Sequence, residues 1–211
     1  MKTFLNQGLF YIVIQTIICL CVFSIFLSVF INFALFSKNT IVQKQKKSIV
    51  ETGTMTLFFF VFYLILVSRL GVISVSQSFL KELLMVLGTI IIVTGCIINI
   101  KGRFNLGKNW ANQINIYQEH TLVQTGMYRI VRHPLYSSTI LMFYGACLAY
   151  RNAVSLIAVT AVFVPFMYYR ARQEEILLEQ KFPQYHEYKL CTGMLLPKIL
   201  KRKERTRNER V

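Results

Sequence analysis

The stretch GLFYIVIQTIICLCVFSIFLSVFINFALF, residues 8–36, contains no charged side chain. A bilayer core about 30 Å thick needs roughly 20 apolar helical residues, so this stretch is long enough to cross it. The apolar core of a secretory signal is only about 7–15 residues long, so we interpret residues 8–36 as a retained anchor. Because a chain in lipid must satisfy its backbone hydrogen bonds internally, the stretch predicts a helical membrane protein.

Four further apolar runs follow, and the whole chain is 55% hydrophobic but only 16% charged. The second run, residues 55–75, contains Arg69, which we expect to reach the interface unless it has a function within the membrane. We expect the last two runs to form a tight helical hairpin, since only Arg151 and Asn152 separate them. We therefore predict an all-α, polytopic membrane protein with about five transmembrane helices. The remaining runs cover residues 83–100, 135–150 and 153–169.

The basic residues lie mainly on one side of these runs. The net charge of +15 arises from 24 Lys and Arg against nine acidic residues, all of them Glu. If the chain crosses five times, 20 basic residues share one side, and only Lys2, Lys81 and Arg151 share the other. The positive-inside rule then places the N-terminus outside, with the connector 101–134 and the C-terminus in the cytosol. We expect the basic cytosolic face to contact anionic lipids, and we expect no nucleic acid partner.

The stretch VRHPLYSS, residues 131–138, places polar side chains at the cytosolic start of the fourth run. Pro134 suits the first position of a helix, which makes His133 the cap and Tyr136 a first-turn residue. The positive end of the helix dipole would then favour an anion at this point. The simpler alternative is a capped helix with interfacial basic and aromatic residues.

A second polar group follows the fifth run, in RARQEE, residues 170–175. If the helix continues into the cytosol, Arg170 and Glu174 share one face, whereas Arg172 and Glu175 point elsewhere. Arginine can grip a carboxylate through two parallel hydrogen bonds, and glutamate can accept from an ammonium or a ribose hydroxyl. The alternative is a solvated surface ion pair. The chain lacks the glycine-rich loops of nucleotide sites, and its five cysteines have no metal-binding or disulfide spacing, so we expect no metal.

Two segments together, HTLVQTGMYRIVRHPLY at residues 120–136 and RARQEEILLEQKF at residues 170–182, resemble the isoprenylcysteine carboxyl methyltransferase family and its relatives among phospholipid N-methyltransferases. The resemblance covers residues 102–197. It implies a cytosolic S-adenosylmethionine site, with Arg170 contacting the substrate and acting in catalysis. Carried over by position, the cofactor contacts fall on Gln113, His120, Thr121, Leu122, Val123, Tyr128, His133, Pro134, Leu135, Tyr136 and Glu174.

The apolar runs and the resemblance together predict an organisation, and the resemblance implies an activity. Residues 1–100 would hold the first three transmembrane helices, residues 101–197 the methyltransferase core, and residues 198–211 a basic tail. The expected reaction is carboxyl O-methylation of a lipophilic or prenylated acceptor that enters from the bilayer. A phospholipid amine, a thiol, or a lipophilic phenol or enol is the alternative acceptor. An NADPH-dependent membrane reductase and a non-catalytic transporter or lipid-binding protein are alternatives of other classes.

Overall fold

The computed structural model describes residues 2–36, 42–46, 49–107, 114–117 and 121–198. Helices dominate the described residues, and a single pair of short strands joins two connectors. The elements are α1 (Lys2–Phe36), β1 (Val42–Lys46), α2 (Ile49–Val67), α3 (Ser78–Leu106), β2 (Ile114–Tyr117), η2 (Gly126–Arg129), α4 (Pro134–Ala149), α5 (Ala153–Ala158), η3 (Val159–Phe163), α6 (Val164–Lys181) and α7 (Tyr185–Cys191).

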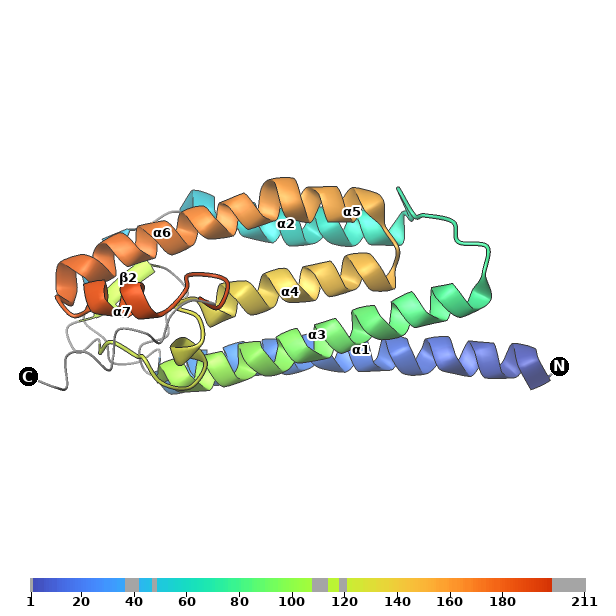
Figure 1. Ribbon diagram of the computed structural model, residues 1–211, viewed down its shortest axis with the longest axis horizontal. Helices are drawn as coiled ribbons and strands as arrows, with labels where there is room; N and C mark the ends of the chain where they lie inside the picture. The colour runs from blue at the N-terminus through green and yellow to red at the C-terminus, as the bar shows by residue number, and fades with distance from the viewer. Residues whose placement is uncertain (1, 37–41, 47–48, 108–113, 118–120, 199–211) are drawn as a thin grey trace, which may run out of the picture.

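The long helices lie side by side along the longest axis of the molecule and reverse direction at each connection (Figure 1). The segments α5, η3 and α6 follow one another without a break and form one long rod. The N-terminus lies at one end of the bundle, and β2, α7 and the start of α4 lie at the other (Figure 1). This second end is called the polar end below.

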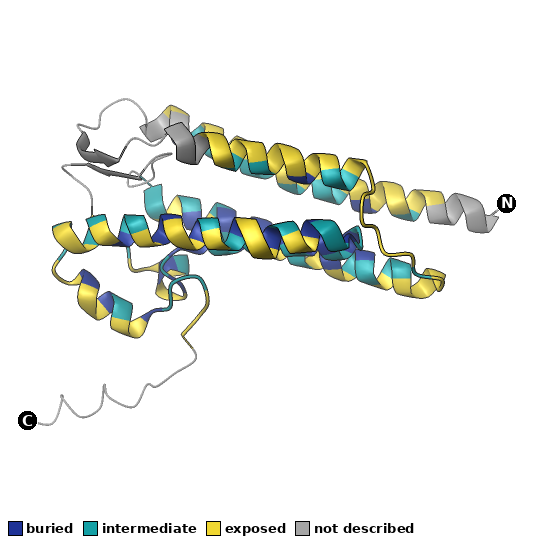
Figure 2. Cartoon of the chain, turned by 90° about the horizontal axis from the view of Figure 1, so that it is seen from above, coloured by how far each residue is buried: buried dark blue, intermediate teal, exposed yellow. Residues whose placement is uncertain are grey.

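Three helical segments are long and apolar enough to cross a membrane by length and composition: Gly8–Asn32, Ser78–Leu106 and Ala153–Lys181. Two shorter apolar helices, Gly53–Val67 and Pro134–Ala149, lie beside them. Much of the apolar surface faces outward, and α1 buries only Ile14, Ser28 and Asn32 among its described side chains (Figure 2). The chain is an integral membrane protein, because lipid is the solvent that tolerates so much exposed apolar surface.

One sequence expectation needs correction, namely the extent of the second apolar run. The all-α class is confirmed, and the structure adds one short antiparallel pair in which Val42 of β1 lies opposite Tyr117 of β2. The second apolar run was predicted over residues 55–75, but its helix, α2, ends at Val67. Arg69 follows in an exposed turn with a left-handed φ of 56°, so it lies outside the helix altogether.

Close packing of α3 against α4 positions the polar end. Gly88, Gly95 and Gly102 recur every seven residues along α3 and lie against the backbone or side chains of α4. A Cβ atom at Gly88 would come within 2.5 Å of the Gly145 carbonyl oxygen, and one at Gly145 within 2.8 Å of the Gly88 oxygen. Small residues allow this close approach of two backbones, which is a common device of membrane helices.

An aromatic cluster packs α2 against α4 and the α5–α6 rod. Phe58 of α2 stacks on Phe163 at 4.8 Å between ring centroids, and Phe163 meets Phe143 edge to face at 4.6 Å. Pro165 lies inside the long rod, where its ring would clash with the carbonyl four residues earlier in a regular α-helix. The preceding turn, η3, is a π-helix, which relieves such a clash while the rod continues.

Candidate functional site

The start of α4 is positioned by residues 126–134, which form an elbow at the polar end. Gly126 opens η2 with a φ of 60°, and the backbone N–H of Met127 donates to Asn105 Oδ1 at 3.0 Å. The chain then turns into α4, with His133 at the cap position and Pro134 as the first helical residue. The predicted start of this helix is confirmed. Asn152 likewise begins α5 by accepting a hydrogen bond from the Ser155 N–H at 2.8 Å, so the expected hairpin is also confirmed.

Three of the predicted cofactor residues meet at this elbow. Tyr136 Oη donates to Glu174 Oε2 at 3.1 Å, and His133 Nδ1 lies 3.6 Å from the same oxygen. The His133 and Tyr136 rings stack nearly parallel, with centroids 5.5 Å apart. His133 is buried, whereas the Glu174 side chain is 37% exposed. The carboxylate of Glu174 therefore has two donors on the protein side and an open side toward solvent.

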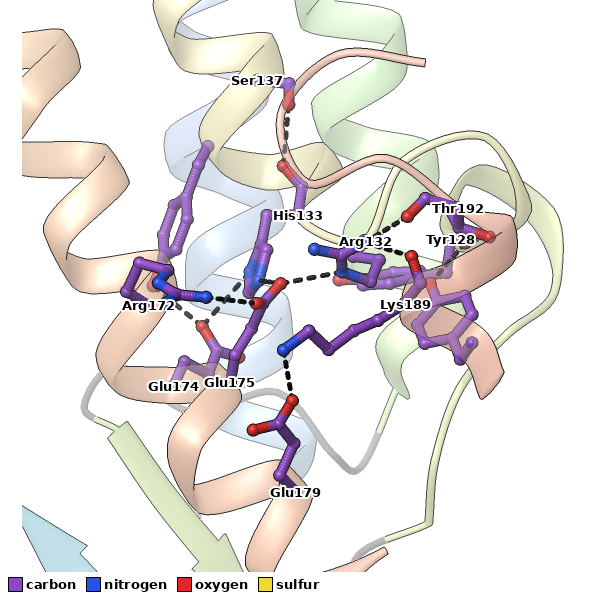
Figure 3. A network of polar contacts seen from close by, with 12 residues as sticks. Tyr128, Arg132, His133, Ser137, Arg172, Glu174, Glu175, Glu179, Lys189 and Thr192 are labelled. Carbon is purple, nitrogen blue, oxygen red and sulfur yellow. Dashed lines mark hydrogen bonds and ion pairs between the residues drawn. The ribbon is translucent and has the colours of Figure 1, made fainter. Parts of the chain in front are cut away.

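Glu175 is a residue of this network that sequence reasoning missed. It was expected to point away, but its Oε1 accepts from Arg132 Nε at 2.8 Å and from His133 Nε2 at 3.2 Å (Figure 3). Its side chain is only 1% exposed. Arg172, which is half exposed, approaches its other oxygen at 3.9 Å. Arg132 in the RHPxY stretch was the available signal, because a buried arginine requires an anionic partner.

The two glutamates set the charge of His133. Burial lowers the pKa of His133, but hydrogen bonds to Glu174 and Glu175 and the negative charge of both outweigh it and raise the pKa to about 8. The imidazole is therefore protonated at neutral pH. Nearby, burial raises the pKa of Tyr128 well above its ordinary value, and the Glu174 charge adds to the rise.

Arg170 lies in α6, as Glu174 does, but the two side chains do not form an ion pair. Only 7% of its surface is exposed, and within the described chain no carboxylate forms an ion pair with it. Its guanidinium lies over the Tyr136 ring, 6.0 Å from the centroid, and Nη1 donates to Met55 Sδ at 3.6 Å. Its Nε is buried and has no hydrogen-bond partner among the residues that the structure describes. The alternative of a solvated Arg170–Glu174 pair is therefore wrong.

The C-terminal segment 192–195 closes one side of the elbow. The backbone N–H groups of Arg132 and His133 donate to the carbonyls of Gly193 at 2.8 Å and Met194 at 3.1 Å. Arg132 Nη1 donates to the Thr192 carbonyl (Figure 3). Ser137 Oγ donates to the Leu195 carbonyl at 2.6 Å. This segment, which we call the strap, was absent from the sequence-based site because its contacts are made by backbone atoms.

The other predicted site residues lie in or before η2, at the start of α4, or outside the described residues. Tyr128 is buried in η2, and its carbonyl accepts from Tyr188 Oη. Gln113 and His120 lie outside the described residues. The segment between β2 and η2 carries Thr121, which is exposed, and Leu122 and Val123, which are partly buried. Leu135 and Pro134 face α3 at Gly102. No group of three or more His, Cys or acidic side chains in the described part of the chain could hold a metal ion.

Comparisons with known proteins point to membrane methyltransferases. Residues 83–185 match the Phospholipid methyltransferase family. The chain is 35% identical over 104 residues to Protein-S-isoprenylcysteine O-methyltransferase A of Arabidopsis thaliana, covering 48% of this chain and 53% of that protein. It is 32% identical over 104 residues to a probable protein-S-isoprenylcysteine O-methyltransferase of Oryza sativa subsp. indica, covering 48% and 54%.

A third relative extends the match slightly. Protein-S-isoprenylcysteine O-methyltransferase of Saccharomyces cerevisiae is 31% identical over 127 residues, covering 59% of this chain and 53% of that protein. The chain spans about half the length of the curated relatives it matches. The resemblance to isoprenylcysteine carboxyl methyltransferases, expected from RHPxY and the glutamate pair, is confirmed. The matched residues include the elbow and α6 but exclude α1, α2 and the strap.

Proposed function

We propose that this protein is an S-adenosylmethionine-dependent methyltransferase that esterifies the carboxylate of a lipophilic, prenylated acceptor at the membrane. The relatives are named for isoprenylcysteine O-methylation, and the matched half of the chain contains the polar network at the elbow. The acceptor, the cofactor and the residue roles below are parts of this proposal.

Buried Arg170 is the observation that carries it. A guanidinium with little exposure and a buried Nε that lacks a partner is costly unless a ligand supplies an acceptor. A carboxylate fits this need best, because it can accept from two guanidinium nitrogens at once. An amine acceptor would add a positive charge beside Arg170, so the site favours an anionic acceptor.

The proposed cofactor site lies at the hydroxyl end of Tyr136, where Glu174 accepts its hydrogen bond. Glu174 presents a partly exposed carboxylate, already oriented by His133 and Tyr136, that could accept from the cofactor's ammonium or ribose hydroxyls. By resemblance, Gln113, Tyr128, Pro134, Leu135 and the run 120–123 would complete the pocket. When bound, S-adenosylmethionine supplies a methyl group on a positively charged sulfur, which is already activated for displacement.

The chain's own residues have little acid–base chemistry to perform. A carboxylate acceptor, with an ordinary pKa of about 4, is ionised at pH 7, so no side chain has to remove a proton. Arg170 would hold the acceptor oxygens in line with the methyl group, while His133, Tyr136 and Glu174 hold the cofactor. Alignment of this kind is worth about 7–11 kcal/mol in favourable cases.

The membrane arrangement belongs to the same proposal. Five crossings, with the N-terminus outside and the polar end in the cytosol, agree with the excess of basic residues in the connector and tail. Residues 101–197 would form the methyltransferase core and residues 1–100 the first three membrane helices. The basic cytosolic face would contact anionic lipids, and the acceptor would enter from the bilayer between helices.

Membranes with and without this protein, incubated with methyl-labelled S-adenosylmethionine and N-acetyl-S-farnesylcysteine, test the proposal. We expect a labelled lipid-phase product whose label is released by mild base as methanol, as a methyl ester requires. A base-stable label on a phospholipid would show an amine acceptor instead. The name of the matching family favours this as the second candidate. Binding of NADPH without S-adenosylmethionine binding would identify a reductase.

A further inference from the structure

Helix α2 brings a methionine to the buried arginine of the site. Met55 lies near the start of α2, and its sulfur accepts a hydrogen bond from Arg170 Nη1 at 3.6 Å. Met55 is partly buried, and it packs against the aromatic cluster that joins α2 to α4 and to the α5–α6 rod. An element outside the matched residues 83–185 therefore touches the residue that we assign to the acceptor.

The surroundings of this contact are apolar. Phe58, one turn further along α2, stacks on Phe163 and meets Phe143 edge to face at 5.6 Å. Tyr136 is partly buried against the same cluster, with its ring under the Arg170 guanidinium. This part of α2 thus forms one wall beside Arg170, where Met55 offers a thioether and Phe58 an aromatic ring.

The contact is chemically weak. A thioether sulfur is a poor acceptor, whereas hydrogen bonds from a guanidinium to a carboxylate are about twice as strong as neutral ones. Among the described contacts, Arg170 therefore has one nitrogen that donates to sulfur and another, Nε, without a partner. A carboxylate that arrives beside Met55 can replace the sulfur at Nη1 with little loss.

We propose that Met55 is a specificity-determining residue of the acceptor site and that the start of α2 is the wall along which the acceptor lies. The acceptor carboxylate displaces the Met55 sulfur from Arg170, and the apolar chain next to the carboxylate packs beside Phe58. This inference rests on the proposed function, since it presumes a carboxylate acceptor at Arg170. It assigns acceptor selection to a segment outside the residues 83–185 that match the family.

Placing a carboxylate at position 55 tests the proposal. Met55→Glu would give Arg170 an internal partner, which the acceptor must then displace. We expect KM for N-acetyl-S-farnesylcysteine to rise by about tenfold or more, because hydrogen bonds to charged groups contribute at least that factor. The Kd for S-adenosylmethionine, measured by calorimetry in detergent, should stay within about twofold, since Met55 lies on the acceptor side.

Two further variants serve as controls. Gly53 is exposed near the polar end of the same helix, and a Cβ there would meet no atom within 4 Å, so Gly53→Glu places the same charge away from Arg170 and should leave KM unchanged. Met55→Gln is neutral, and we expect a rise in KM of about threefold because an amide is a better acceptor than sulfur. It also provides the measurement if Met55→Glu does not fold.

The outcomes separate this inference from the proposed function. Unchanged KM in Met55→Glu, an equal rise in Gly53→Glu, or loss of S-adenosylmethionine binding in Met55→Glu would each overturn the role of Met55. If Met55→Glu does not fold, wild-type KM in Met55→Gln overturns it. Failure of the wild-type protein to make a base-labile product would instead refute the proposed function itself.

Discussion

Glu175 accepts hydrogen bonds from both Arg132 and His133, at 2.8 and 3.2 Å, from a position that is 1% exposed. One carboxylate of α6 thereby fixes two consecutive residues at the start of α4. Arg132 in turn holds the strap through the Thr192 carbonyl. Glu175 and Arg132 thereby join α6, the start of α4 and the strap, three segments that are distant in sequence.

Removal of the Glu175 carboxylate should therefore destabilise the whole polar end. We expect Glu175→Ala to lower the free energy of unfolding by about 3–5 kcal/mol, because it leaves the buried charges of Arg132 and His133 without this partner. Thermal unfolding in detergent measures the loss. Glu179→Ala is the matched control on the same helix, because Glu179 pairs with Lys189 at the surface and should contribute about 1 kcal/mol or less. Equal losses in both variants would contradict the role of Glu175 in holding Arg132 and His133.

The stability of the protein without cofactor should depend on pH through His133. Its pKa of about 8 in the folded state exceeds the ordinary value of 6.5, so protonation favours the folded state. This contribution, about 2 kcal/mol, is complete below pH 6.5 and is lost as the pH rises through 8. Thermal midpoints measured from pH 6 to 9 should fall over this range in the wild type and change less in His133→Asn. Identical profiles in the two proteins would refute the assignment.

Tyr136→Phe should weaken cofactor binding without unfolding the protein. The variant keeps the ring that stacks on His133 but loses the hydrogen bond to Glu174. We expect the Kd for S-adenosylmethionine to rise by about tenfold, since hydrogen bonds to charged groups contribute about 1.5–3 kcal/mol. Tyr144→Phe is the control, because Tyr144 bonds only to Thr160 on an exposed surface. Wild-type affinity in Tyr136→Phe would remove Tyr136 from the cofactor site.

The glycine contacts between α3 and α4 should not tolerate a branched side chain. In Gly88→Val, the new atoms would meet the backbone of α4, and overpacking of this kind costs about 1–3 kcal/mol. Gly8→Ala is the control, since a Cβ there meets no atom within 4 Å. Unfolding in detergent should separate the two variants, and an unaffected Gly88→Val would contradict the close approach of these helices.

Features encoded within single segments could be predicted from the sequence. The apolar runs predicted four of the five long helical segments close to their observed positions. Pro134 marked the start of α4, because proline suits the first position of a helix. The grouping of His133, Tyr136 and Glu174, which come from two distant segments, was anticipated only through the family resemblance, and their functional roles stay predictions.

Other features made by contacts between distant segments could not be predicted. Glu175 was misjudged because helical spacing describes the faces of one isolated helix, whereas its partners, Arg132 and His133, come from the elbow. The strap binds through backbone carbonyls, which leave no pattern in the sequence. Met55 lies in an ordinary apolar run, and only the packing of α2 places it at Arg170.

The central claim is that Arg170 holds the carboxylate of a lipophilic acceptor for methylation. Initial rates of purified Arg170→Ala against N-acetyl-S-farnesylcysteine, together with calorimetry of S-adenosylmethionine, test it most directly. We predict that KM for the acceptor rises by about tenfold or more while the Kd for S-adenosylmethionine stays within about twofold. Wild-type KM and turnover in Arg170→Ala, or a loss of affinity confined to S-adenosylmethionine, would contradict this role.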